Sequence, residues 1–361
     1  MRSSYKLFRI KGIEVSLHLT LLLLFLMPLL DLFAYNNIAE GLIFAAYSLV
    51  FLLVLFGSVL VHELAHSLVA MRNNIRVNQI ILTPIGGIAS MGAGMVKKAS
   101  IELKVSLAGP LASLAIGTVL FLLLTAMAGS ETLGKAVMSG KFIDEPSLFH
   151  IAVMVMYVNL ILGLFNLFLP IFPMDGGRVL RSMLCFVTDR MRATRIAVYI
   201  GQAFLSVLLV FALIVGSLWL IAIAIFLFFA GLVELRMMEV SEKVKKIDLA
   251  KFVVSNLVVL HSGFDSGDIG KIQKKTQSIY PVLDDNGKPV GFLESDKAFE
   301  KGKSASNIMS TEPPIARLND DKDDMLGKVY SNGYVFIVDP KGVFLGVLTM
   351  QNLQNALKAR T

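Results

Sequence analysis

The sequence predicts a polytopic α-helical membrane protein, with about six spans and a re-entrant hairpin, followed by a soluble α/β region. Of its 361 residues, 55% are hydrophobic and only 17% are charged, against about 25% charged in an average globular domain. Long apolar runs fill the first two thirds of the chain, and each reaches the roughly 20 residues that cross a bilayer. After about Met238 charged residues return, and short apolar strands alternate with turns.

Hydropathy and helix breakers set the limits of the expected spans. Pro170 and Pro173 interrupt the fourth span, and Gly216-Ser217 separates the last two. The spans are expected at about 15–34, 42–71, 103–128, from 148 to the proline break, and twice within 196–235.

Loop charge predicts the orientation of these spans. Lysine and arginine gather before the first span and in every second loop after it, whereas the opposite loops hold few cations. Cationic loops stay on the cytosolic side, so both termini and the α/β region of this cell-membrane protein are expected in the cytosol.

The net charge of +7 would also suit nucleic acid. Its clustering at span ends instead favours the lipid bilayer as the partner and no nucleic acid.

The segment 77–94 is apolar but contains Pro84 and four glycines, among them Gly86 and Gly87. These residues break helices and suit a hairpin. At membrane depth, non-helical backbone survives only where protein covers it or where it lines a wet cavity. We therefore expect a re-entrant hairpin beside the metal motif of the second span. An ordinary interfacial loop is the alternative.

The second span carries, toward its end, His62-Glu63-Leu64-Ala65-His66, which has the spacing of a zinc-hydrolase motif. Residues four apart share one face of a helix, so both imidazoles can bind one metal ion, with Glu63 beside it to take a proton from water. A histidine in an apolar helix is more often a hydrogen-bonded packing residue. Here, however, the motif follows a charge-free run at 42–61, where each ionisable group costs about 2.5–3.5 kcal/mol on insertion scales. A metal site at membrane depth is therefore predicted.

The proline break of the fourth span supplies a candidate third ligand. A catalytic zinc site needs three protein ligands and one open position for water. The break leaves Asp175 at about the depth of the two histidines, near the cytosolic face, whereas Asp31 and Asp144 belong at the opposite face. The alternative is that Asp175 only caps a helix that begins at Gly176.

Together these residues resemble the site-2 protease family of intramembrane zinc metalloproteases. The resemblance implies that His62, His66 and Asp175 bind one zinc ion per chain and that Glu63 is the general base. It also implies hydrolysis of peptide bonds within or near the membrane-spanning segments of other proteins. The match rests on HELAH at 62–66, PIGGIA at 84–89, SLAGPLAS at 106–113 and FNLFLPIFPMDGGR at 165–178.

The same resemblance implies how a substrate is held. The hairpin, with Gly86 and Gly87, would line the substrate path, where an unwound substrate can pair with the hairpin's edge. An asparagine before the prolines would position the substrate, but the run from Asn166 to Asp175 is one residue longer here than in the family. Asn159, about two turns earlier, is the other candidate.

The third span carries small residues four apart at Gly109, Ser113 and Gly117. Such spacing lets helices approach closely, and helix packing is the interpretation we favour. His18 and His150 lie near span ends, so we assign them to the membrane interface and not to the metal site.

The soluble region contains an internal repeat. An aspartate followed by glycines three and seven residues later occurs at Asp284 and again at Asp339. Each copy has the pattern of a strand, a turn, a strand and a helix. The pair resembles tandem CBS domains, which implies a module that binds an adenine nucleotide, with Thr349 as a candidate contact, or a structural module that forms a homodimer. The expected domains are a protease domain at 1–238, a linker at 239–246 and cytosolic CBS domains at 247–361.

Two other classes of function are compatible with parts of the sequence. A CBS-regulated membrane transporter could use the broken fourth span and the glycine hairpin as a permeation path. A catalytically silent membrane receptor could bind the metal without catalysing a reaction. A transporter has no use for a glutamate beside two ligand histidines, so a metalloendopeptidase is favoured over it. Proteolysis that depends on Glu63 would separate the enzyme from the receptor.

Overall fold

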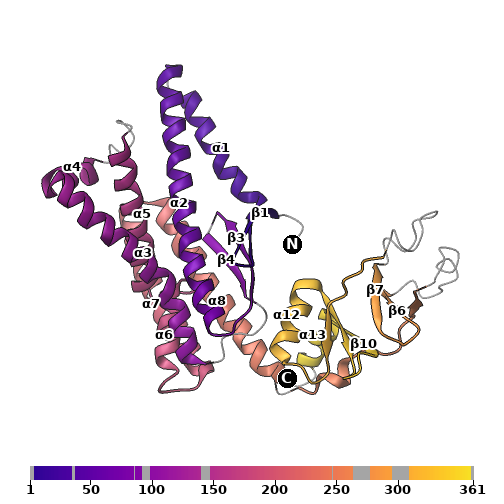
Figure 1. Cartoon of the computed structure of the whole chain (residues 1–361). Helices are drawn as coiled ribbons and strands as arrows, with labels where there is room; N and C mark the ends of the chain where they lie inside the picture. Colours follow the sequence, from indigo (N-terminus) through magenta and orange to yellow (C-terminus); the bar gives the residue numbers. More distant parts are fainter. Residues whose placement is uncertain are drawn as a thin grey trace. The chain divides into compact units, whose positions relative to one another are not determined.

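The computed structural model describes residues 4–34, 37–84, 86–91, 98–139, 147–245, 247–262, 277–294 and 309–358. The chain divides into two compact units, Met1–Arg236 and Met237–Thr361, of which the first is mainly helical and the second is α/β (Figure 1). Helix α8 (Leu218–Lys245) begins in the first unit and ends in the second.

Five of the described helices are long and apolar enough to cross a membrane, and they coincide with the second to sixth expected spans. Their large apolar side chains are exposed, as those of Leu122, Phe211 and Trp219 are, which suits contact with lipid chains. The helices are α2 (Ile38–Arg72), α3 (Ala99–Ala128), α5 (Leu148–Phe168), α7 (Arg190–Val215) and α8.

The N-terminal segment differs from the expected helix at 15–34. Its first residues belong to strand β2 (Ile13–His18), and helix α1 (Leu19–Ala34) begins after them. The strand forms because Lys11-Gly12, both at positive φ, make a two-residue turn that pairs β2 with β1 (Ser4–Ile10). With 16 residues, α1 is shorter than the other apolar helices, so the count of six spans stays a prediction.

The expected hairpin is present as the antiparallel strands β3 (Val77–Thr83) and β4 (Gly86–Met91). Gly92 and Gly94 lie outside the described residues. Strand β3 also pairs in parallel with β2, which gives a four-stranded sheet in the order β1-β2-β3-β4. The hairpin lies against α2, and β4 is an edge strand of the sheet (Figure 1).

Helix α3 packs against α2, α5 and α6 (Asp175–Leu184), so it contacts every helix that carries a candidate site residue. Gly117 of α3 approaches Leu160 of α5 so closely that an added Cβ would overlap the leucine side chain. The packing role expected for Gly117 is therefore confirmed. The short helix α4 (Ser130–Ser139), which follows α3, was not predicted (Figure 1).

The expected break after the fourth span is confirmed. Helix α5 ends at Phe168, and residues 169–174 run without helix to α6 (Asp175–Leu184). A Cβ at Gly176 would meet the carbonyl oxygens of Leu167 and Leu169, so only glycine lets α6 begin this close to the end of α5. This close approach fixes the position of the first residue of α6.

The repeat of the second unit appears as two equal turns. The carboxylates of Asp284 and Asp339 each accept a hydrogen bond from the backbone N–H four residues later, at 2.7 and 2.8 Å. Gly287 and Gly342, both at positive φ, close these turns. The helix expected after the first copy lies outside the described residues.

The described strands of the second unit form two three-stranded sheets, in the orders β5-β6-β7 and β10-β9-β8. The elements of this unit are η2 (Leu249–Phe252), β5 (Leu260–His261), β6 (Ile279–Leu283), β7 (Pro289–Glu294), β8 (Ile315–Arg317), α12 (Lys322–Asn332), β9 (Tyr334–Val338), β10 (Phe344–Thr349) and α13 (Met350–Lys358).

Candidate metal centre

Three side chains from two helices meet in the interior of the first unit. His62 and His66 lie on one face of α2, and Asp175 is the first residue of α6. Asp175 Oδ2 lies 3.1 Å from His62 Nε2 and 3.1 Å from His66 Nε2. All three side chains are buried, and their ligand atoms lie within 4.8 Å of one another. Two imidazole nitrogens and a carboxylate oxygen form a donor set that catalytic zinc sites use.

Helix α3 orients both imidazoles through their other nitrogens. His66 Nδ1 lies 2.6 Å from the carbonyl oxygen of Val105, and His62 Nδ1 lies 3.0 Å from Ser113 Oγ. A carbonyl oxygen only accepts, so His66 donates from Nδ1 and keeps the lone pair of Nε2 for a metal. The four-residue spacing of small residues favours helix packing for Ser113, and its contact with His62 is a second role. Nothing in the local pattern could have shown a contact between residues 51 positions apart.

Gly109 of α3 faces the ligand nitrogens directly. A Cβ at this position would overlap Nε2 of both His62 and His66. Glycine is therefore needed to keep this space open, and the packing role expected for Gly109 was incomplete. The oriented Nε2 atoms, the carboxylate and the open space together fit a zinc ion.

Glu63 follows His62 on α2 and is half-buried against strand β4. Gly87 of β4 comes so close that a Cβ there would overlap Cγ and Cδ of Glu63. Gly86 has a φ of +133°, an angle that residues with a side chain rarely adopt, and there is open space where its Cβ would be. The hairpin thus contacts the glutamate of the motif through Gly87.

The two candidate asparagines have different surroundings. Asn159 is buried and donates from Nδ2 to Ser58 Oγ at 3.0 Å, one turn before His62 on α2. Its Oδ1 has no hydrogen-bond partner among the described atoms. Asn166 is half-buried and donates to the carbonyl oxygen of Leu162 in its own helix at 2.9 Å. The structure therefore brings Asn159, and not Asn166, to the helix that carries the histidines.

Within the part of the chain that the structure describes, no other group of three His, Cys, Asp or Glu residues has its ligand atoms this close together. His18 is the last residue of β2 and His150 lies in the first turn of α5; neither belongs to the group of three. The side chains of Asp31 and Asp144 are outside the described set.

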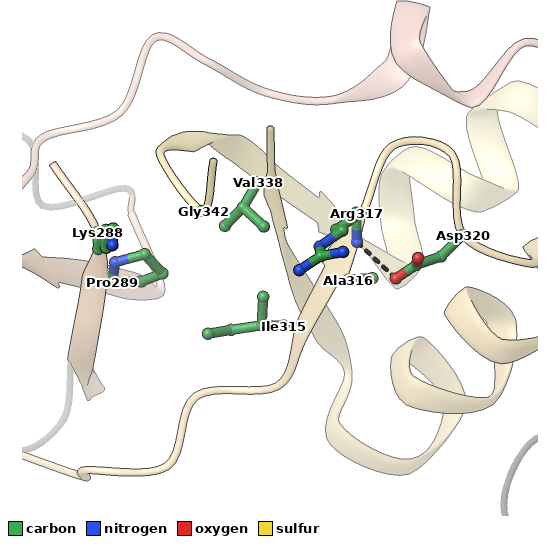
Figure 2. Close-up of a pocket in the computed structure, with 8 residues that line it drawn as sticks. All are labelled: Lys288, Pro289, Ile315, Ala316, Arg317, Asp320, Val338 and Gly342. Carbon is green, nitrogen blue, oxygen red and sulfur yellow. Dashed lines mark hydrogen bonds between the residues drawn. The ribbon is translucent and has the colours of Figure 1, made fainter. Parts of the chain in front are cut away.

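The second unit contains a cavity of about 350 Å³. Lys288 and Arg317 give it two cationic side chains, and Figure 2 shows the guanidinium of Arg317 pointing into the cavity. Thr349 does not line this cavity; its hydroxyl accepts a hydrogen bond from the backbone N–H of Asn352 at 3.2 Å, at the start of α13. The cavity is lined by Lys288, Pro289, Ile315, Ala316, Arg317, Asp320, Val338 and Gly342 (Figure 2).

Known proteins resemble both parts of this chain. Residues 50–211 match the family model described as Peptidase family M50. The chain is 31% identical over 363 residues to the zinc metalloprotease MJ0392 of Methanocaldococcus jannaschii. The matched region covers 99% of this chain and 97% of that relative. The solved site-2 protease from the same organism is 33% identical and covers 63% of this chain and 93% of that chain, with a TM-score of 0.45. A CBS domain protein from Streptococcus pneumoniae TIGR4 is 16% identical and covers 34% of this chain and 94% of that chain, with a TM-score of 0.31.

The fold and the site define a multi-pass membrane metallohydrolase, because a buried His–His–Asp triangle adjoins a glutamate on helices of membrane-spanning length. The chain belongs to peptidase family M50, since its relative is 31% identical over nearly the whole length of both proteins. It is a zinc-dependent intramembrane endopeptidase, as the resemblance to the site-2 proteases predicted.

Replacing Gly109 with alanine should weaken zinc binding, because the added methyl group would overlap the ligand nitrogens. We expect an affinity at least about tenfold lower, the lower end of the range for damaged zinc surroundings. Zinc per purified chain, measured at a buffered free zinc concentration, checks this. Gly57→Ala is the matched control, because that position on α2 has open space around it. Equal zinc content in the two variants would show that the space at Gly109 does not matter.

Proposed function

We propose that His62, His66 and Asp175 bind the zinc ion and that Glu63 is the general base of peptide hydrolysis. The convergence of both Nε2 atoms on Asp175 Oδ2 in a buried site is the observation that carries this proposal. Burial of an isolated carboxylate among apolar helices is costly, and a bound divalent cation offsets that cost.

Each residue of the site has a distinct role in the reaction. When bound, zinc polarises the scissile carbonyl and lowers the pKa of a water molecule toward about 7. Glu63 takes a proton from the attacking water and delivers it to the leaving amine. Val105 and Ser113 keep the imidazoles in the orientation that presents Nε2, so the ligands need no rearrangement during turnover.

We propose that the substrate is a membrane-spanning segment of another protein, cleaved within or near its span. The bonds of a helical substrate are shielded by its own turns, so it must unwind, and its freed backbone groups then need partners. Strand β4 offers an open edge among the described strands, next to Glu63. A substrate strand that pairs with β4 would lie beside the general base. We assign substrate positioning to Asn159, whose Oδ1 is unused, rather than to Asn166.

The cationic loops support a topology in which both termini and the second unit face the cytosol. We propose a protease domain at 1–238, a linker at 239–246 and a regulatory CBS pair at 247–361, through which two chains form a homodimer. Residues 239–245 are the last turns of α8, so this linker would be largely helical.

Replacing Glu63 with glutamine should abolish cleavage while zinc stays bound, because the amide cannot take the proton and the residue is not a ligand. We expect a rate about 10²–10⁴-fold lower, the usual contribution of a general base. The measurement is cleavage of a transmembrane-segment substrate in detergent, with zinc quantified in each preparation. Glu40→Gln, in the first turn of the same helix, is the control. Undiminished cleavage by Glu63→Gln would refute the assigned role, and wild-type protein without zinc would favour the transporter.

Replacing Gly87 with valine should impair cleavage while zinc binding is kept. The new side chain would push Glu63 from its place, but it does not reach the ligands by any described contact. We expect a fall in kcat of at least about tenfold, since a misplaced base loses most of its contribution. Gly134→Ala, at an open position of α4, should behave as wild type. Unchanged kcat for Gly87→Val would remove the hairpin from the active site.

A second proposal concerns the cavity of the second unit. We propose that it binds an adenine nucleotide, with Arg317 and Lys288 as partners of the phosphate groups. The two cationic side chains around a cavity of about 350 Å³ are the observation that favours a phosphorylated ligand. Thr349 is not part of this assignment, because it does not line the cavity.

Arg317→Ala should weaken ATP binding by about tenfold or more, because a charge-assisted hydrogen bond is lost. Calorimetric titration of the full-length protein with ATP measures this. Lys251→Ala, an exposed cation of η2 outside the cavity, is the control. If wild-type protein does not bind ATP, the second unit is a structural or dimerising module instead.

A further inference from the structure

A largely buried ion network joins the helices around the candidate metal centre. The guanidinium of Arg181 on α6 forms an ion pair with Glu102 of α3, with Nε donating to Glu102 Oε1 at 2.9 Å, and a second with Glu234 of α8 at 2.7 Å. Arg190 of α7 pairs with the other oxygen of Glu102 at 2.9 Å. The side chains of Arg181 and Glu102 are each only 5% exposed. Four helices are thus joined by charges that the proposed reaction does not use.

Arg181 also contacts the segment that leads to Asp175. Its guanidinium carbon lies 4.9 Å from the centroid of the Phe172 ring, three residues before Asp175. Phe172 is almost fully buried, so the ring is itself held in place. Arg181 therefore restrains both the helix that begins at Asp175 and the loop before it.

The partner of Arg181 lies on the helix that also holds the histidines. Glu102 precedes Val105 by three residues, about one turn of α3, and Val105 accepts the hydrogen bond of His66. Ser113, farther along α3, contacts His62. Helix α3 thus contacts the two histidines directly. Its ion pair with α6 is through Glu102 and Arg181.

We propose that Arg181 is a positioning residue of the metal centre: its ion pair with Glu102 sets the distance between Asp175 and the two histidines. This inference rests on the proposed role of the three residues as zinc ligands. A short helix held only by packing could slide or rotate along α3, and its carboxylate would then leave the ligand triangle. The guanidinium donates from Nε and Nη2 to Glu102 Oε1 and from Nη1 to Glu234 Oε1. A planar donor group held by two carboxylates on different helices restricts such movement.

The test compares zinc dissociation constants in detergent, measured by competition with a chelator of known affinity, for the full-length protein. The variants are Arg181→Ala, Arg181→Lys and the double variant Glu102→Gln/Arg181→Met. The double variant removes both of the most buried charges together. Arg190 and Glu234 each lose one partner in it, but their side chains are 20% and 27% exposed, so it is the variant most able to fold. Arg192→Ala is the matched control, because it removes an exposed ion pair with Asp189 at the start of α7.

We expect Arg181→Ala and the double variant to bind zinc about 10–100-fold more weakly, the range found when groups behind metal ligands are removed. Zinc binding by Arg181→Lys should be weakened less than zinc binding by Arg181→Ala, because lysine keeps the charge but not the planar set of donors of arginine. The absorption spectrum of the cobalt-substituted protein should change with the double variant and stay unchanged with Arg192→Ala. A purely structural role would lower the melting temperature without altering either zinc readout.

Wild-type zinc affinity in a folded double variant would overturn the inference, even if its melting temperature falls. This outcome is distinct from failure of the proposed ligand set, in which wild-type protein itself would bind no zinc. If Arg181→Ala does not fold, the double variant and Arg181→Lys decide the question alone.

Discussion

The contact between Asp175 and the two histidines of α2 is the constraint on which the helical unit depends. A carboxylate inside a bundle of apolar helices is costly, so the fold must bring it to partners that compensate it. His62 and His66 are those partners, at 3.1 Å each. To bring Asp175 to this depth, the chain breaks the fourth span and starts a new helix at the carboxylate. The prolines and the glycine pair of the break therefore serve to place Asp175 beside the two histidines.

Helix α3 is the common support of this contact, although it contributes no ligand. Within about three turns it offers Glu102 to the ion network, Val105 to one imidazole and Ser113 to the other. Gly109, between them, leaves the space that an ion needs. Because α3 makes all these contacts, it is the common neighbour of the two helices that carry the three residues: it contacts α2 through His62 and His66, and α6 through the Arg181–Glu102 ion pair.

Close backbone approach recurs around the site. Gly87 brings the edge strand of the sheet against Glu63, Gly109 brings α3 against the imidazoles, and Gly176 brings α6 against the end of α5. In each case a methyl group would overlap a neighbouring atom. These glycines let strand β4 and helices α2, α3, α5 and α6 approach one another closely, so that Glu63, the His–His–Asp group and the edge strand lie near one another.

The sequence by itself determined the elements whose signals are local. Apolar runs of bilayer length predicted five of the helices, and the prolines predicted the break before Asp175. The glycines predicted a hairpin within 77–94, where the structure has the paired strands β3 and β4. Spacing within one helix identified His62, Glu63 and His66. The turn Lys11-Gly12, which begins the unpredicted strand β2, was a local signal that hydropathy alone obscured.

Only the tertiary structure decided which distant residues serve the site. The contacts of Val105 and Ser113 with the histidines span 39 and 51 residues, and the pair Arg181–Glu102 spans 79. Gly109 and Gly117 belong to the same pattern of small residues spaced four apart. Gly117 packs against a leucine, whereas Gly109 packs against imidazole nitrogens, and the pattern does not distinguish the two. Periodicity states which face of a helix a residue occupies. What that face meets depends on how the helices pack, and this is a property of the whole fold.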